Sequence, residues 1–359
     1  MLRKNPISSS AFNYGRHKRL QFRLFSSIEK IYELSGRRKQ RLDMLTKVYS
    51  PLMIHKEGSQ EWTKLIKSGK SGRTTFVHLS FQAEYSDFLK AIDGLKGSSK
   101  VSSVDLLQGL TVGFTQQSCA IEGNTLGLKE TQKVWNSLNK NCNLSDFLKN
   151  QEMLLPAPSV LSDKPENEVI EIRNHLLATY FLYNISYKWK HEIDFDGIKK
   201  IHRILLKDTR VKIVKLEEGQ AYDYSLHQHA GEFRKLEVEA RGSVSTVYPL
   251  PMEVPALMER FIQFWYESKN SGLHPLIIAS RILSTFLHIH PFIDGNEHVG
   301  RLIMALYLIR NGYPPIIFQD INREEYGSTL FLAQTEKDSI PLYALVVQTI
   351  FNILMRYQE

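Results

Sequence analysis

The sequence predicts a mainly α-helical fold that contains one β-hairpin. Apolar residues recur at the three- and four-residue spacing of helices through most of the chain after residue 100. One segment, residues 237–247, places two short β-like runs on either side of Gly242, which is the pattern of two strands and a turn. The chain has 359 residues, of which 42% are hydrophobic and 23% are charged. This composition is typical of globular proteins, and the length is sufficient to bury a large core.

The first half of the chain is predicted to be helical with irregular connections. Residues 28–50 combine charged residues with scattered apolar ones and are expected to form one helix. A second helix is expected over Val104–Ser118, where the apolar spacing is helical until Gly123-Asn124 breaks it. A third helix is expected over Lys129–Leu138. A proline-rich linker at residues 154–165 follows and marks the clearest internal boundary.

Helical patterns fill most of the chain beyond this linker, and the hairpin interrupts them once. Gly312 and the pair Pro314-Pro315 end one of these helices. The predicted helices are Glu166–Trp189, Asp194–Leu206, Val254–Ser268, Leu273–Leu287, Val299–Arg310, Arg323–Gln334 and Leu342–Tyr357.

Basic residues are concentrated at the N-terminus. Residues 1–27 contain six Lys and Arg residues and no acidic residue, and removing these six charges from the net charge of +8 leaves +2 for the remainder. The body of the chain is therefore near neutral, and no general nucleic-acid surface follows. The Arg- and Ser-rich composition of residues 1–25 indicates a mitochondrial transit peptide, so the mitochondrial matrix is the expected location. The alternative is a basic tail that binds polyanions, on a cytoplasmic protein.

Two further sequence features limit the function classes. No stretch approaches the roughly 20 apolar residues that a membrane span needs. The two cysteines, Cys119 and Cys142, have no metal-ligand spacing around them. The sequence therefore predicts neither a disulfide framework nor a zinc site.

Candidate functional residues are concentrated in one segment between two predicted helices, His290-Pro291-Phe292-Ile293-Asp294-Gly295-Asn296. A helix that starts at Gly295 and Asn296 presents backbone N–H groups whose positive potential suits a polyphosphate. Asp294 is a hard oxygen ligand for Mg²⁺, and Arg301 can hold terminal phosphate oxygens. His290 can accept a proton from an attacking hydroxyl. The alternative is a tight hinge in which Asp294 and Asn296 only cap a helix.

This string resembles the signature of the Fic (Fido) family, His-Pro-Phe-x-Asp/Glu-Gly-Asn-Gly-Arg-x-x-Arg. Other segments resemble the eukaryotic Fic enzymes that modify chaperones, so the resemblance extends over roughly residues 105–359. These segments are Gly231-Glu232-Phe233-Arg234, Val254-Pro255-Ala256-Leu257-Met258, Gly312-Tyr313-Pro314-Pro315 and Ala333-Gln334.

The resemblance implies a Fic-type helical bundle that transfers AMP from ATP, with Mg²⁺, to a Ser, Thr or Tyr hydroxyl of a protein such as a chaperone. It implies His290 as the catalytic base and Asp294 as the metal ligand. The nucleotide and phosphate would be bound by Gly295, Asn296, Arg301 and Gln334. The hairpin would be a flap that aligns the target by strand pairing, with Leu236 and Val238 as its positioning residues. Nucleic acid and a membrane are not expected partners, and a homodimer is left open.

The segment Ser118-Cys119-Ala120-Ile121-Glu122-Gly123-Asn124 resembles the family's autoinhibitory motif, in the class with an N-terminal inhibitory helix. Glu122 at a helix C-terminus would pair with Arg301 and keep ATP from binding in the reactive orientation. The alternative is an ordinary helix-ending Glu with a glycine cap. In some relatives the same Glu helps a water molecule to remove AMP, so the resemblance leaves the reverse reaction open as well.

Two residues depart from the family signature. Glu297 stands where the signature has Gly, and His298 stands where it has Arg. A carboxylate at position 297 would repel a phosphate by on the order of a few kcal/mol. His298 is expected to be mostly neutral at about pH 7, and it lacks the bidentate fork of Arg. The departures favour an alternative function, a degenerate Fic pseudoenzyme that binds nucleotide or protein without transfer.

The predicted organisation has four parts. Residues 1–25 form the transit peptide, and residues 26–100 form an N-terminal region of helical and irregular structure. Residues 101–165 contain the inhibitory helix and the linker. Residues 166–359 form the Fic core, whose motif occupies residues 290–301.

Overall fold

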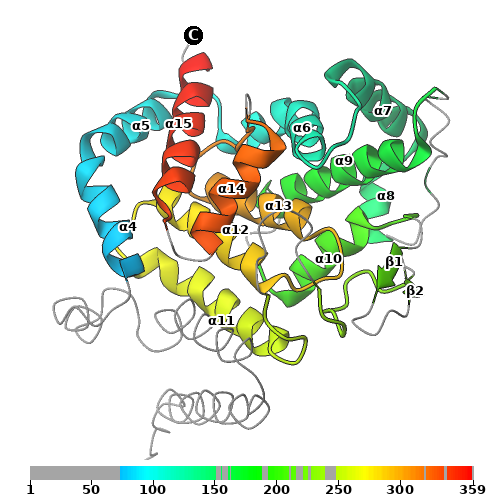
Figure 1. Ribbon diagram of the computed structural model, residues 1–359. Helices are drawn as coiled ribbons and strands as arrows, with labels where there is room; N and C mark the ends of the chain where they lie inside the picture. Colours follow the sequence, from blue (N-terminus) through cyan, green and yellow to red (C-terminus); the bar gives the residue numbers. More distant parts are fainter. Residues whose placement is uncertain are drawn as a thin grey trace, which may run out of the picture.

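The computed structural model describes residues 73–357 except for residues 151–154, 156–160, 162, 188–192, 210–211, 216–220, 225–227, 239–247, 319–320 and 335–337. This part of the chain is mainly α-helical (Figure 1). Its α-helices are α4 Arg73–Glu84, α5 Ser86–Ser98, α6 Ser103–Ala120, α7 Leu128–Asn141, α8 Leu144–Lys149, α9 Glu166–Tyr187, α10 Phe195–Leu205, α11 Val254–Glu267, α12 Pro275–Ile289, α13 Asn296–Arg310, α14 Arg323–Gln334 and α15 Ile340–Arg356. The predicted transit peptide and the predicted helix over residues 28–50 lie outside the described residues.

Each helix predicted after residue 100 is present, with its ends shifted by at most three residues where both ends are described. One shift affects the site: α13 begins at Asn296, three residues before the predicted start. The helix starts there because Gly295 adopts a left-handed conformation, with φ 71°, and forms the N-cap. Glu297 and His298 therefore lie in the first turn of α13, and Arg301 lies in the second turn rather than in the first.

Two short strands form an antiparallel pair away from the predicted hairpin. Strand β1, Lys212–Lys215, pairs with strand β2, Ala221–Tyr224, with Lys212 opposite Tyr224. Four residues are too few for a period of two to be distinguished from chance, which is why the sequence did not indicate these strands. The hairpin predicted over residues 237–247 falls mostly on residues 239–247, outside the described part, and the described Glu237 and Val238 are not in a strand.

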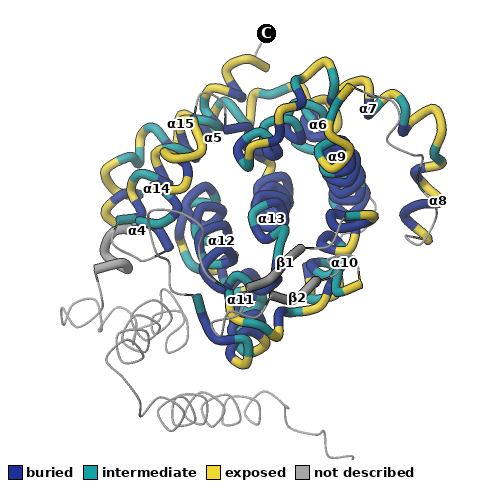
Figure 2. The backbone as a smooth tube through the Cα atoms, turned by 45° about the vertical axis from the view of Figure 1, so that its right-hand side comes forward, coloured by how far each residue is buried: buried dark blue, intermediate teal, exposed yellow. Residues whose placement is uncertain are grey.

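Helices α12 and α13 form the centre of the molecule. Helix α13 packs against α12, α9, α6 and α10, and every residue from His298 to Ile309 is buried. Figure 2 shows α13 in dark blue, surrounded by helices whose outer faces are yellow. The two central helices approach closely at Gly300, where an added Cβ atom would lie 3.1 Å from the Leu287 Cδ2 atom. The site therefore stands on a helix that the whole core holds in place.

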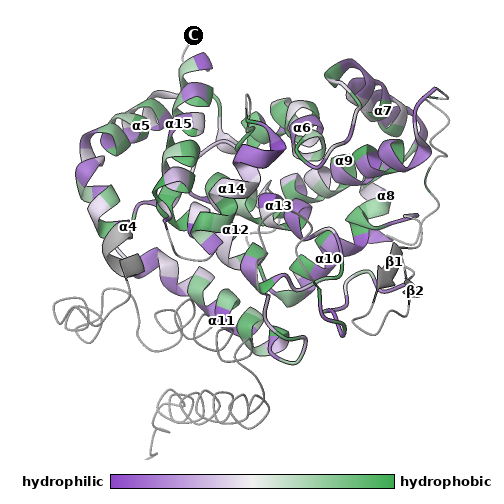
Figure 3. Ribbon diagram, in the orientation of Figure 1, coloured by the Kyte–Doolittle hydropathy of each residue, from purple (hydrophilic) through white to green (hydrophobic). Residues whose placement is uncertain are grey.

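The outer helices bury one face each. In α7 the buried residues are Thr131, Val134 and Leu138, which share one side of the helix. Figure 3 shows the corresponding alternation of purple and green along the outer helices. Across the described residues, none of the helices has the length and apolar character that crossing a membrane requires.

Candidate active site

His290 ends α12 in an uncommon backbone conformation. Its φ angle is 49°, in the left-handed region, and its backbone N–H donates to the Phe286 carbonyl at 3.0 Å. Non-glycine residues seldom adopt this conformation, and those that do often lie at functional sites. The Nδ1 atom lies 3.3 Å from the Leu287 carbonyl oxygen, and the ring stacks on Tyr248 with centroids 4.2 Å apart. Because a carbonyl only accepts, Nδ1 carries the proton of the neutral ring, and the lone pair is on Nε2.

Two side chains brace the turn that follows His290. The Arg234 Nε atom donates to the His290 carbonyl at 2.6 Å, and the Arg234 backbone N–H donates to the Pro291 carbonyl at 2.8 Å. The Asn296 amide pairs with the backbone of Phe292 in both directions, at 2.9 and 2.8 Å. Asn296 is buried and uses its side chain within the turn. If Asn296 binds phosphate as predicted, the group that does so is its backbone N–H.

His202 connects this turn to the segment before the predicted flap. Its Nε2 atom lies 3.0 Å from the Asp294 carbonyl oxygen, and its Nδ1 atom accepts the Gly231 N–H at 2.7 Å. Its ring stacks on Phe292 at 3.7 Å, with 7° between the planes. Burial lowers the pKa of His202 to about 4, so the ring is neutral at physiological pH with its proton on Nε2. His202 is buried, so its ring is part of the packing around the turn.

The predicted metal ligand and flap residues lie on either side of this connection. The Asp294 side chain is partly exposed, and its Oδ1 atom accepts the Gly295 N–H at 3.0 Å. Leu236 and Val238 pack against a small apolar cluster formed by Leu206 and Ile293. The predicted flap residues therefore pack against a cluster to which the motif contributes Ile293.

Arg301 is the most completely buried charged residue of the site, with 1% of its side chain exposed. Its Nη2 atom contacts the Glu122 carboxylate, so the predicted pairing of these two residues is present. The same atom donates to the Ser118 carbonyl at 2.9 Å, and Nε donates to the Ser118 hydroxyl at 2.7 Å. The acidic partners raise the pKa of Arg301 despite its burial, so the guanidinium stays charged.

The segment that carries Glu122 is fixed at the end of α6 by the backbone and by α14. Gly123 has a φ angle of 103°, and the Asn124 N–H donates to the Cys119 carbonyl, which closes the helix end. Arg323 of α14 donates from Nη1 to the Glu122 carbonyl at 3.0 Å. Both interpretations of the sequence therefore hold at once, since this segment is a glycine-capped helix end and its Glu pairs with Arg301.

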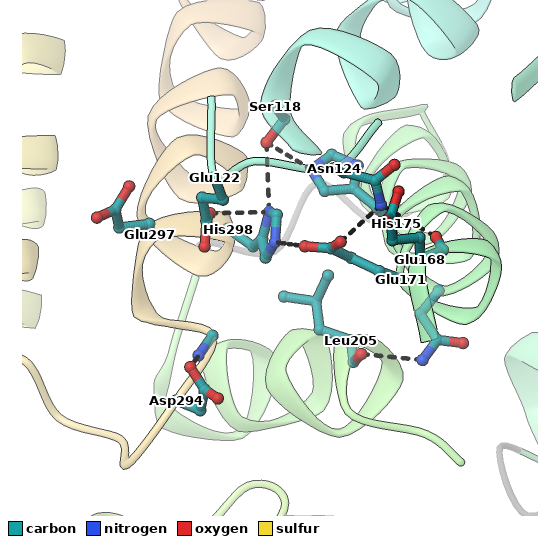
Figure 4. Close-up of polar contacts among 12 residues, drawn as sticks. Ser118, Glu122, Asn124, Glu168, Glu171, His175, Leu205, Asp294, Glu297 and His298 are labelled. Atoms are coloured by element: carbon teal, nitrogen blue, oxygen red, sulfur yellow. Dashed lines mark hydrogen bonds and ion pairs between the residues drawn. The ribbon is translucent and has the colours of Figure 1, made fainter. Parts of the chain in front are cut away.

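Helix α9 holds the other side of the same segment. The Glu168 Oε2 atom accepts from the Thr125 N–H at 2.7 Å and from its hydroxyl at 2.6 Å. The Asn124 amide donates to the Glu171 Oε2 atom at 2.6 Å. These bonds place Glu122 next to His298, as Figure 4 shows.

His298 lies between two carboxylates on the buried side of α13. Its Nε2 atom is 2.9 Å from the Glu171 Oε1 atom, and its Nδ1 atom is 3.3 Å from the Glu122 Oε1 atom (Figure 4). Burial alone would lower the pKa of His298, but the two carboxylates outweigh it and raise the pKa above its usual value. The expectation for His298 assumed an unperturbed pKa, and the neighbouring carboxylates shift that pKa upward.

Glu297 extends from the other side of α13 (Figure 4). Its Oε2 atom lies 3.1 Å from the Arg301 Nη1 atom, one helical turn along the same helix. Desolvation of its carboxylate by the surrounding site and the Glu122 charge raise the pKa of Glu297, while Arg301 opposes that shift. The carboxylate that was expected to repel a phosphate is thus engaged with the residue expected to bind one.

Several residues of the site were not predicted from the sequence. Ser118 joins the Arg301 guanidinium to His175, whose Nε2 atom is 2.8 Å from the Ser118 hydroxyl. Burial lowers the pKa of His175 well below its usual value, so this imidazole is neutral. A signal for Ser118 existed, because it opens the inhibitory motif, but nothing local in α9 indicated Glu171 or His175. Gln334, predicted to bind nucleotide, ends α14 and is buried.

One group of side chains resembles a metal site in composition. Ligand atoms of Cys119, Glu171 and His298 lie within 4.8 Å of one another. The Arg301 Nη2 atom lies 3.0 Å from the His298 Nδ1 atom, so a cation placed there would meet a fixed positive charge. Burial also raises the pKa of Cys119 well above its usual value, which disfavours the thiolate that a metal needs. The grouping is better explained as part of the hydrogen-bonded network around Arg301.

Sequence comparison relates this arrangement to known proteins. Residues 192–308 match the profile of the Fic/DOC family. Over 216 residues the chain is 32% identical to "Protein adenylyltransferase Fic" of Drosophila grimshawi, a segment that covers 60% of this chain and 36% of that protein. The counterpart of Drosophila persimilis is also 32% identical over 216 residues, with 60% and 35% covered. The matched segment thus spans about a third of the length of these curated relatives.

Solved structures confirm the fold. The chain superposes on residues 134–508 of Fic-1 from C. elegans with a TM-score of 0.54 and 21% identity, covering 88% of this chain and 80% of that one. It superposes on a Fic domain containing signaling protein from Bacteroides thetaiotaomicron with a TM-score of 0.53 and 17% identity, covering 76% of this chain and 96% of the other. The predicted mainly α-helical, Fic-like fold is therefore confirmed.

Proposed function

Because the chain contains a Fic/DOC family domain and is distantly homologous to the eukaryotic protein adenylyltransferase Fic, we propose that it transfers AMP from ATP to a hydroxyl group of a protein. One observation carries the proposal: the turn between α12 and α13 holds His290 and Asp294 next to the helix that bears Arg301. The residue types that the chemistry needs are thus on one rigid hairpin of helices.

His290 would act as the general base. With its proton on Nδ1 donated to the Leu287 carbonyl, the ring can accept a second proton at Nε2. Arg234 and Tyr248 hold the residue from two sides, so the ring is oriented before a substrate arrives. A target hydroxyl that reaches Nε2 would lose its proton there as its oxygen attacks the α-phosphorus, and the bond from that phosphorus to the bridging oxygen would break so that pyrophosphate leaves.

The residues of the turn fit a Mg²⁺ nucleotide. Asp294 offers a partly exposed carboxylate, the kind of oxygen ligand that Mg²⁺ takes, and the His202 bond fixes its backbone. Gly295 and the start of α13 provide backbone N–H groups at a helix N-terminus, where an anion is stabilised. Bound there, Mg²⁺ would neutralise part of the phosphate charge. Arg301 and the nearby α14, which ends at Gln334, would complete the nucleotide site.

Glu122 would keep the enzyme inactive. It contacts the Arg301 guanidinium and comes from a different element, at the end of α6, so it can leave without unfolding α13. Movement of this segment would release Arg301 for the terminal phosphate. The same carboxylate could also orient a water molecule, so removal of AMP by the same site belongs to the proposal.

The target would be a protein with an accessible Ser, Thr or Tyr, and a chaperone is one candidate. Leu236 and Val238 pack against the cluster that contains Ile293 of the motif, and they would position the target peptide by strand pairing. A homodimer remains open within this proposal.

A second candidate function is a nucleotide- or protein-binding module without transfer. The contact between Glu297 and Arg301 favours it, because a carboxylate already occupies the guanidinium from the same helix. The geometry of His290 opposes it, since a binding module does not need a basic nitrogen held in this way.

The test compares labelling of the full-length chain and of protein substrates with Mg²⁺ and α-³²P-ATP. Wild type, Glu122→Gly and His290→Ala proteins are incubated alone and with a mitochondrial protein extract. We expect Glu122→Gly to increase the label, most strongly when it is combined with Glu297→Gly, and His290→Ala in that background to abolish it. Absence of label in Glu122→Gly together with Glu297→Gly would eliminate the transferase and leave the binding module.

The proposed location is the mitochondrial matrix, on the composition of residues 1–25. A fluorescent protein fused after residue 35 should be imported and shortened, and replacing Arg3, Arg16, Arg19 and Arg23 by Gln should leave it in the cytoplasm. Import of both versions, or of neither, would contradict the proposal.

A further inference from the structure

The Arg301 guanidinium is occupied on all of its nitrogen atoms. Nη2 contacts Glu122 and the Ser118 carbonyl, Nε donates to the Ser118 hydroxyl, and Nη1 lies 3.1 Å from the Glu297 Oε2 atom. Two carboxylates therefore share one guanidinium, and they approach it along different edges. Removal of Glu122 from this arrangement leaves Nη1 paired.

Glu297 and Glu122 differ in how they are attached. Glu122 lies on another element, and 26% of its side chain is exposed. Glu297 is four residues before Arg301 on α13, where helical spacing keeps the two side chains adjacent, and 42% of its side chain is exposed. A conformational change of the α6 end would carry Glu122 away, but it would not move Glu297.

We propose that Glu297 is a second clamp on Arg301, so that the site admits a nucleoside triphosphate only when both carboxylates have released the guanidinium. This inference rests on the proposed function, in which Arg301 binds the terminal phosphate. It makes Glu297 a specificity-determining residue, because the ligand must displace a charge that is built into the binding helix.

The local charge supports the clamp. Arg301 faces Glu122 and Glu297, and His298 beside it faces Glu122 and Glu171. Three carboxylates thus surround one guanidinium and one imidazole, so this region holds no surplus of positive charge for a phosphate. The raised pKa of Glu297 is consistent with two carboxylates competing for one partner.

The clamp can be measured as affinity for Mg²⁺-ATP by calorimetry, with the full-length chain. The proteins are wild type, Glu122→Gly, Glu297→Gly and the double variant, with Glu297→Gln as a replacement that keeps the shape and helical propensity. The exposed Glu259 of α11, changed to Gln, is the matched control. Thermal unfolding of each protein verifies that it is folded.

We expect each single variant to bind Mg²⁺-ATP less than about threefold more tightly than wild type does. The double variant should bind it about 10- to 100-fold more tightly, since removing a competing charged hydrogen bond changes an affinity by a factor of this size. Glu297→Gln should act like Glu297→Gly, and Glu259→Gln should act like wild type. The clamp is refuted if Glu122→Gly alone binds as tightly as the double variant, or if Glu297→Gly has no effect in the Glu122→Gly background.

The outcome separates this inference from the proposed function. A double variant that binds Mg²⁺-ATP tightly but transfers no AMP supports the clamp and eliminates the transferase. A Glu122→Gly protein that binds and labels as strongly as the double variant supports the transferase and refutes the clamp. Absence of Mg²⁺-ATP binding in every variant refutes both.

Discussion

At the scale of single residues, His202 is a positioning residue for the site. Its ring bonds both to the Asp294 carbonyl and to the Gly231 N–H, and both bonds are formed by a neutral ring. The turn that contains Asp294 and the segment before the predicted flap are therefore connected through one imidazole. Its stacking on Phe292 adds packing to these hydrogen bonds.

Replacing His202 with Phe should preserve the stacking and remove both hydrogen bonds. The Gly231 N–H and the Asp294 carbonyl would then be left without this partner, at about 1–3 kcal/mol each for a buried group. We expect the free energy of unfolding in urea to fall by about 2–4 kcal/mol, and labelling to require more Mg²⁺. His229→Gln, at a partly exposed position of the same segment, should change neither quantity. An unaltered Mg²⁺ requirement would argue against a positioning role.

The pair of His298 and Glu171 should make stability depend on pH. The pKa of His298 is raised in the fold, so its contribution is complete below its unfolded value of about 6.5 and is lost as the pH rises through the folded value. The pKa of Glu171 is lowered, so its contribution is present above about 4.3 and is lost as the pH falls through the folded value. The pair should therefore contribute most to the free energy of unfolding between about pH 4.5 and 6.5.

The measurement is the difference in unfolding free energy between wild type and His298→Asn across about pH 5 to 9. We expect the difference to shrink as the pH rises, because wild type loses the protonated imidazole while Asn does not titrate. With Glu171→Gln in both proteins the slope should become smaller. A difference that stays constant over the whole range would mean that the pKa of His298 is the same in the folded and unfolded states, and a difference that grows with pH would mean that the imidazole is neutral in the fold.

The residues of the site were predictable to the extent that they lie in contiguous motifs. His290, Asp294 and Arg301 occur within one string, and Glu122 occurs within a second string that its glycine marks. Glu171 and His175 lie within α9 and reach the site through the packing of α9 against α6 and α13, so no local pattern could indicate them. The upward shift of the His298 pKa was not predicted for the same reason, since one of the two carboxylates that raise this pKa is Glu171.

At the scale of secondary structure, the end of α6 is the element that decides where Glu122 lies. The left-handed Gly123 closes this end, and an added Cβ atom would lie 3.4 Å from the Arg323 Nη1 atom, which itself bonds to the Glu122 carbonyl. Helices like this one were predicted well because their apolar spacing is long and regular. The position of the flap depends instead on residues 239–247, which the structure does not describe.

Two glycines of the same region make a matched test of this element. Gly109 lies inside α6, is exposed, and has nothing within 4 Å of an added Cβ atom, so Gly109→Ala should stabilise the protein by about 0.5–1 kcal/mol. Gly123→Ala places a side chain at a φ angle of 103° and should destabilise by about 1–2 kcal/mol. Chemical denaturation measures both values. Equal effects of the two substitutions would show that the α6 end is not held in this conformation.

At the scale of the whole molecule, the ion pairs that occupy the Arg301 guanidinium also stabilise the fold. Arg301 is buried on the central helix, and its charge is compensated by Glu122 from α6 and by Glu297 from α13. A buried charge that loses its partners is strongly destabilising. The variants that open the site for a nucleotide should therefore weaken the protein in the absence of the nucleotide.

This coupling predicts the behaviour of the Glu122→Gly, Glu297→Gly double variant. Both carboxylates are partly exposed, so we expect a loss of about 2–4 kcal/mol rather than the full cost of a dry ion pair, and a fall in Tm of about 5 °C or more. Mg²⁺-ATP should reverse this loss, because a ligand at 100 times its Kd stabilises by about 2.7 kcal/mol. Differential scanning fluorimetry with and without Mg²⁺-ATP measures both effects.

The Tm of wild type should change little on addition of Mg²⁺-ATP. His290→Ala in the double variant should retain the increase in Tm, because binding does not need the base. Equal responses of wild type and double variant would show that Arg301 is already accessible in the native fold.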